Sequence, residues 1–142
     1  MGILMTVNAA GPQPMMFRVH GIRYQTRNVS RAVAFYTGTL GFELKHQQGE
    51  AFAAVSSGGL DLLLSGAESS GARPLPDGQR QEPGGWNRLV LAVDDLESAV
   101  TVLHDRGIAF RHAIISGPGG QQIQILDPDR NPIELFEPVR RS

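Results

Sequence analysis

Two copies of one short pattern decide the fold: Asn28-Val29-Ser30-Arg31-Ala32-Val33 and, 67 residues later, Asp95-Leu96-Glu97-Ser98-Ala99-Val100. Each copy begins with a residue that commonly caps a helix, and apolar residues then follow at helical spacing. Just before the two copies, residues 19–26 and 88–93 carry apolar side chains at every second position, which is the period of a strand with one covered face. We therefore expect a strand followed by a helix, twice.

The repeat continues beyond the helices. Gly41, which would end the first helix, has its counterpart in Gly107, and Leu60-Asp61-Leu62 is matched by Ile133-Glu134-Leu135. Three further strands are expected after each helix, so that each unit has the order βαβββ. Their predicted bounds are 42–47, 51–56 and 60–65 in the first unit, and 109–115, 121–126 and 133–137 in the second.

The repeat divides the chain into segments. We expect a flexible N-terminal extension (1–16), a first module (17–65), a Gly, Pro and Ser-rich linker (66–86) and a second module (87–138), the modules together forming one domain. A linker of this length is unusual inside a compact domain. It is either a lid over a ligand or a strap along the outside of the sheet.

Composition excludes several classes of function. The 142 residues carry a net charge of −1 with no block of like charges, which argues against nucleic acid as a partner. Cysteine is absent, and no apolar run reaches the ~20 residues that span a bilayer. Met1-Gly2 with Thr6 fits a loose myristoylation pattern, although a flexible terminus is the simpler interpretation. We expect a soluble, cytoplasmic protein without a membrane partner.

Three motifs carry a resemblance to a known family. They are Val33-Ala34-Phe35-Tyr36 with Leu40-Gly41-Phe42, then Val93-Asp94-Asp95-Leu96, and finally the run from Asp127 to Leu135. Over residues 17–138 the chain resembles the glyoxalase/bleomycin-resistance/dioxygenase group, the vicinal oxygen chelate superfamily. The resemblance implies an α+β fold in which the curved mixed sheets of two βαβββ modules enclose a cleft.

One residue departs from the family pattern. Arg130 stands where the family usually has glycine. Because Asp127-Pro128 favours a tight turn and Asn131 tolerates a positive φ, we expect the turn to form nevertheless.

The resemblance also implies where a metal would be held, since the metal enzymes of the family place ligands on the first strand of each unit and a Glu on the last strand of the second. Glu134 falls on the last of these positions, but the first-strand positions fall on Gly21 and Arg88, and neither side chain can coordinate a cation. His20 is one residue away and so on the other face of its strand. Asp61 could add only a second carboxylate. We therefore expect no metal and no other cofactor.

The inward strand faces predict a ligand site without a metal. Arg88 should pair with Glu134, and Trp86 should lie at the mouth of the cleft. The alternation of Gln122 and Gln124 with Ile residues fits a polar inward face, although it also fits a solvated one, and Trp86 could instead pack against the second sheet. The predicted ligand-binding residues are Arg23, Gln25, Trp86, Asn87, Arg88, Gln122, Gln124 and Glu134.

Two histidines occupy equivalent positions in the repeat. His46 is expected on the same strand face as Phe42 and Leu44, and His112 on the face of Phe110. Such a pair could serve a function, but partly buried or surface histidines on strands are commoner.

These residues favour a metal-free binding protein that sequesters a small aromatic or antibiotic-like molecule and, as the resemblance implies, forms a homodimer. The alternative is a divalent-metal-dependent lyase, epimerase or extradiol-type dioxygenase of the same superfamily. A third hypothesis makes Glu134 the general base of a metal-free enzyme. It is weakened because a neighbouring arginine favours the charged carboxylate and so makes it a poorer base.

Overall fold

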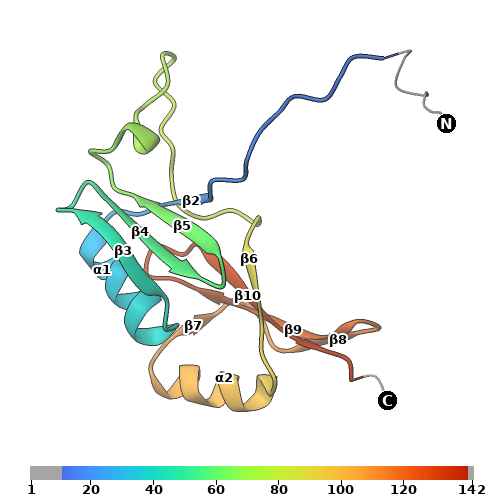
Figure 1. Ribbon diagram of the computed structural model, residues 1–142. Helices are drawn as coiled ribbons and strands as arrows, with labels where there is room; N and C mark the ends of the chain where they lie inside the picture. Colours follow the sequence, from blue (N-terminus) through green and yellow to red (C-terminus); the bar gives the residue numbers. More distant parts are fainter. Residues whose placement is uncertain (1–10, 141–142) are drawn as a thin grey trace.

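The computed structural model describes residues 11–140, so the myristoylation pattern lies outside the described residues. Two mixed sheets are packed side by side (Figure 1). Sheet 1 has the strand order β2-β5-β4-β3, and sheet 2 has the order β6-β10-β9-β7 with β8 paired to β9. The α+β fold class is confirmed, and β2 and β6 each pair in parallel with the last strand of their own unit.

The bounds of the elements follow the repeat closely. The strands are β2 (Ile22–Gln25), β3 (Glu43–Gln48), β4 (Phe52–Ser57), β5 (Leu60–Ser65), β6 (Leu89–Ala92), β7 (Ala109–Phe110), β8 (Ile115–Gly117), β9 (Gly120–Leu126) and β10 (Pro132–Pro138). The helical elements are α1 (Val29–Ala34), which continues into the π turn η2 (Phe35–Thr39), then η3 (Ser70–Ala72) and α2 (Leu96–Asp105). None of the helices within residues 11–140 is long and apolar enough to cross a membrane.

The helices begin and end at the expected residues. The Asn28 side chain accepts a hydrogen bond from the Arg31 backbone N–H at 2.9 Å, and Asp95 accepts one from the Ser98 N–H at 3.1 Å. Gly41 (φ +79°) and Gly107 (φ +76°) provide the left-handed residues that follow the helices.

The helix-facing sides of both sheets share one apolar core. Leu62 and Leu64 from sheet 1 and Ile125 and Ile133 from sheet 2 belong to it. Tyr24 joins the sheets directly, because its hydroxyl donates to the Pro132 carbonyl at 2.8 Å and accepts from the Leu89 N–H at 2.9 Å. The opposite side of each sheet faces away from the helices and is called here its open face.

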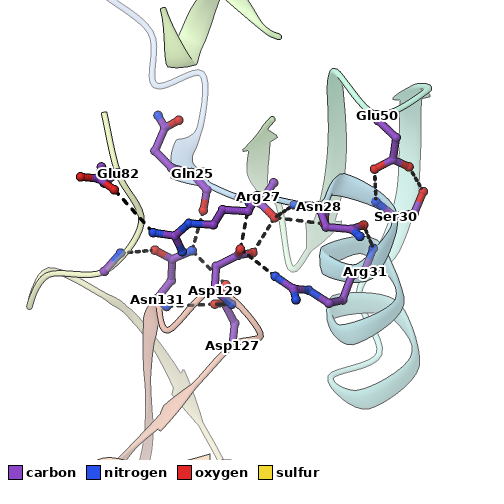
Figure 2. Close-up of polar contacts among 12 residues, drawn as sticks. Gln25, Arg27, Asn28, Ser30, Arg31, Glu50, Glu82, Asp127, Asp129 and Asn131 are labelled. Atoms are coloured by element: carbon purple, nitrogen blue, oxygen red, sulfur yellow. Dashed lines mark hydrogen bonds and ion pairs between the residues drawn. The ribbon is translucent and has the colours of Figure 1, made fainter. Parts of the chain in front are cut away.

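Polar contacts of the turn between β9 and β10 connect the second unit to the first (Figure 2). Asp129 is buried and accepts hydrogen bonds from the Arg27 N–H (2.8 Å), the Arg31 guanidinium (2.9 Å) and the Thr26 hydroxyl. Asp127 accepts the Tyr36 hydroxyl at 2.8 Å. Burial raises the pKa of both Asp127 and Tyr36, because each loses water around its charged form. These buried contacts connect residues about a hundred positions apart in the sequence.

Three local expectations were wrong. The strand predicted over 109–115 is broken into β7 and β8. The left-handed residue of the β9–β10 turn is Arg130 itself (φ +68°), not Asn131. The ladder between β3 and β4 shifts between Leu44 and His46, which makes Lys45 an extra residue and moves His46 onto the open face, away from the face of Leu44.

Candidate functional site

The open face of sheet 2 is built from strand residues that stand in two rows. Strand register aligns Val90, Glu134 and Gln124 in one row. It aligns Ala92, Phe136, Gln122 and Ile115 in the next. Because side chains alternate between the two faces of a strand, Ile133 and Leu135 point into the core and Glu134 points to the open face.

Glu134 is the centre of this face. It is 7% exposed, its Oε1 accepts a hydrogen bond from Arg88 Nε at 3.0 Å, and Arg88 Nη2 lies 2.9 Å from the same oxygen as an ion pair. Gln122 is assigned the amide orientation that places its nitrogen toward Glu134, where it donates to Oε2 at 2.8 Å and Oε1 at 3.1 Å. Both carboxylate oxygens are therefore occupied by side chains of this chain.

Arg111 is the site residue that the sequence analysis missed. Its Nη1 donates to Gln124 Oε1 at 2.8 Å, its Nη2 donates to the Gly85 carbonyl at 3.0 Å, and its guanidinium lies over the Trp86 ring at 4.1 Å. A signal was available in the sequence, because Arg111 has the opposite strand parity to Phe110, which is partly buried against the core.

The end of the linker holds both arginines. The Gly84 N–H donates to Asn131 Oδ1 at 2.7 Å, and the carbonyls of Gly85 and Trp86 accept hydrogen bonds from Arg111 and Arg88, the latter at 3.0 Å. Trp86 is 68% exposed, and its ring packs against the Arg111 guanidinium. Asn87 is also exposed and lies next to this network.

Arg23 and Gln25 lie apart from this group, on the open face of sheet 1. Arg23 Nη1 donates to Ser65 Oγ at 2.7 Å, and Gln25 Nε2 donates to the Gly71 carbonyl of the linker at 2.9 Å. Within residues 11–140, none of their side-chain hydrogen bonds reaches the Arg88–Glu134 pair. The structure thus brings together Trp86, Arg88, Gln122, Gln124 and Glu134, but not Arg23 and Gln25.

The residues at the implied metal positions do not fit a metal ion. A side chain at Gly21 would place its Cβ 2.7 Å from the Asp61 carbonyl oxygen, so this backbone leaves no room for a ligand there. Arg88 pairs with Glu134 through Oε1, so the carboxylate is already neutralised by a guanidinium that would repel a cation at this position. Within residues 11–140, no three His, Asp or Glu side chains are close enough to share an ion.

The histidines do not add ligands to this centre. His20 and His46 are exposed, and the His46 ring lies 6.5 Å from the Phe52 ring on sheet 1. His112 Nδ1 lies 2.7 Å from the Ala113 carbonyl oxygen. The predicted symmetric pair therefore contributes no shared site.

Comparison with known proteins places these features in context. The model of the Glyoxalase/Bleomycin resistance protein/Dioxygenase superfamily matches residues 18–135. YwkD, an uncharacterized protein of Bacillus subtilis (strain 168), is 29% identical over 129 residues, which cover 84% of this chain and 95% of YwkD.

Two solved structures are similar in fold and sequence. A member of the same superfamily from Sphaerobacter thermophilus DSM 20745 is 27% identical with a TM-score of 0.69, covering 87% of this chain and 99% of the other. TnmS3, an antibiotic binding protein from Streptomyces sp. CB03234, is 28% identical with a TM-score of 0.62, covering 88% and 100%.

Proposed function

Because this chain belongs to the glyoxalase/bleomycin resistance protein/dioxygenase superfamily, we propose that it is a binding protein that captures a small, flat aromatic or antibiotic-like molecule without a metal ion. The observation that carries the proposal is the Arg88–Glu134 ion pair, which stands at positions that the resemblance implies for the metal ligands of the family's enzymes. The antibiotic-binding relative TnmS3 supports the same class of ligand.

The open face of sheet 2 has the chemistry that such a ligand needs. Its polar centre is internally satisfied, since Glu134 accepts from Arg88 and Gln122. Around this centre the apolar side chains of Trp86 (68% exposed), Val90 (56%) and Ile115 (48%) face solvent. Exposed apolar side chains gathered around a few oriented polar groups are typical of small-molecule sites.

An enzyme that uses Glu134 as a base is less consistent with this geometry. A general base needs a free oxygen within hydrogen-bond reach of its substrate. Here Oε1 and Oε2 are both engaged, and Glu134 is 7% exposed. The function proposed here is therefore capture rather than turnover.

We further propose that the protein forms a homodimer in which the open face of sheet 1 of one copy covers that of sheet 2 in the other. A binding cavity needs a second wall. On sheet 1, Arg23 and Gln25 bond to Ser65 and to the Gly71 carbonyl rather than to Glu134, which supports a second copy as the source of that wall. Sedimentation equilibrium tests this directly, and a monomer at micromolar concentration would contradict it.

A fluorescence titration tests the binding proposal. Trp86 is the single tryptophan of the chain, so its emission reports on this face. A panel of anthracyclines and anthraquinones is titrated into the wild type, Ile115→Glu and Val102→Glu. Both substituted residues are 48% exposed, but Val102 lines the groove of about 630 Å³ beside α2, and Ile115 does not.

We expect at least one compound of the panel to quench Trp86 and to lose affinity for Ile115→Glu but not for Val102→Glu. Loss only in Val102→Glu, or no binding of any compound, would contradict the proposed site. Metal analysis of protein purified without chelator is the parallel test, in which a stoichiometric transition metal would contradict a metal-free protein.

A further inference from the structure

Arg111 is held in place by neutral groups. The two oxygens that accept its hydrogen bonds belong to an amide side chain and a backbone carbonyl, and the third contact is the Trp86 ring. Arg27, Arg31 and Arg88 instead form ion pairs with Glu82, Asp129 and Glu134. None of the ion pairs found within residues 11–140 includes Arg111.

The charge balance of the open face follows from these contacts. Arg88 and Glu134 neutralise each other, so the half-buried Arg111 leaves the face with one excess positive charge. Gln124 is directly opposite Glu134 in the strand register, and its amide oxygen faces Arg111. The positive charge is thus displaced from the Arg88–Glu134 pair toward Trp86 and the outer strands.

The guanidinium also keeps hydrogen-bonding capacity. Arginine has five N–H donors, and two of those of Arg111 are used. The hydrogen bonds and the stacking on Trp86 fix its orientation, so little side-chain entropy remains to be lost on binding. A planar cation fixed in this way is suited to accept a carboxylate, sulfonate or phosphate group.

We infer that Arg111 selects ligands in which an anionic group is joined to a flat apolar body. The anion binds the guanidinium, and the apolar body lies against Trp86, Ile115 and Phe136. This inference rests on the proposed function of the open face and adds to it the charge of the ligand. Arg111 is then the specificity-determining residue of the site.

Two probes with the same ring system separate charge from shape. 8-Anilino-1-naphthalenesulfonate carries a sulfonate, and N-phenyl-1-naphthylamine lacks it. Each is titrated into the full-length protein while Trp86 is excited and energy transfer to the probe is recorded. The proteins compared are the wild type, Arg111→Gln, Arg111→Lys and Arg106→Gln, an exposed arginine that lines the groove beside α2.

We expect the wild type to bind the sulfonate probe at least about tenfold more tightly than the neutral probe. A hydrogen-bonded charge pair strengthens binding by about that factor. Arg111→Gln should remove this preference, Arg111→Lys should keep part of it, and Arg106→Gln should keep it all. Added salt should lower the affinity for the sulfonate probe and leave the affinity for the neutral probe unchanged.

The outcomes distinguish a failure of the role assigned to Arg111 from a failure of the proposed binding function. Equal affinity for the two probes in the wild type, or a preference that survives in Arg111→Gln, overturns the role of Arg111 but leaves ligand binding intact. If Arg106→Gln loses the preference instead, the anionic group binds in the groove beside α2, and this result also overturns the role of Arg111. Failure of both probes to bind counts against the proposed function itself. Circular dichroism verifies that each variant is folded, and if Arg111→Gln is not, Arg111→Lys and the salt titration decide.

Discussion

Asp61 and Glu134 occupy equivalent positions in the two repeats, yet they have different surroundings. Asp61 pairs with Lys45 at 3.3 Å, and the side chains are 31% and 52% exposed. Glu134 pairs with Arg88 at 2.9 Å, and the corresponding values are 9% and 26%. Exposed pairs contribute little to stability, whereas a buried charge that loses its partner is costly. At these two matching positions, therefore, the ion pair of the second unit is largely desolvated, and that of the first unit is exposed.

The β4–β5 and β9–β10 turns, which occupy equivalent places in the two units, also differ in how much polar structure they bury. The β4–β5 turn is formed by Gly58 (φ +55°) and Gly59 (φ +83°), which adopt left-handed conformations without side-chain support. The β9–β10 turn contains Asp127 and Asp129, whose carboxylates are buried against the first unit. The second repeat thus supplies both the candidate site and the polar contacts that hold the repeats together.

The largest effect should come from removing the buried carboxylate of that turn. Asp129→Ala should lower the free energy of unfolding by about 3 kcal/mol, because Arg31, Thr26 and the Arg27 N–H all lose the carboxylate that accepts their hydrogen bonds. Asp61→Ala should cost no more than about 0.5–1 kcal/mol. Urea denaturation measures both, and similar costs would remove the distinction between the repeats.

The two ion pairs can be compared next. Arg88→Met should destabilise the protein by about 2 kcal/mol, a value below that of a fully buried pair because Arg88 is partly exposed. Lys45→Met should change stability by less than about 0.5 kcal/mol. Arg88→Met/Glu134→Leu should recover most of the loss, since no unpaired charge remains. A double variant as unstable as the single one would contradict this account.

Substitutions in the two turns should change the free energy of unfolding in opposite directions. Arg130→Gly should raise the free energy of unfolding by about 0.5–1 kcal/mol, because relief of the left-handed strain exceeds the extra entropy of glycine in the unfolded chain. Gly59→Ala should lower it by about 1 kcal/mol for the reverse reason. Thermal unfolding by calorimetry records both changes. A lower melting temperature for Arg130→Gly would show that the arginine has a compensating contact.

The smallest difference concerns the helix caps. Hydrogen bonds from Ser98 hold the pKa of Asp95 below its ordinary value, so its contribution is complete above that value and is lost as the pH falls through the lowered pKa. Asn28 does not titrate. The gap in stability between wild type and Asp95→Asn should therefore be constant above about pH 5 and should change only in more acidic solution. Asn28→Asp should introduce the same acid dependence into the first repeat.

The sequence predicts more of the fold than of the site. Capping residues, glycines and apolar alternation are local signals, and they placed both helices and the face of Glu134 correctly. The bulge at Lys45 and the break between β7 and β8 have no local signal, because the pairing of whole strands decides them. For this reason the predicted face of His46 is wrong, whereas the strand parity of Arg111 relative to Phe110 was a signal that the sequence did contain. The separation of Arg23 and Gln25 from Glu134 likewise depends on how the sheets pack, which strand parity does not encode.

The linker offers a practical use. It is anchored at one end by the hydrogen bond from the Gly66 N–H to the Ala51 carbonyl and at the other by Gly84 and Asn131, whereas the backbone bonds of the tip join Leu75 to Gln79 and Gly78 to Leu75. The tip projects away from both sheets (Figure 1). A circularly permuted fluorescent protein inserted between Asp77 and Gly78 should be tolerated and would be joined to Trp86 by eight residues of chain, which makes this protein a scaffold for a genetically encoded biosensor.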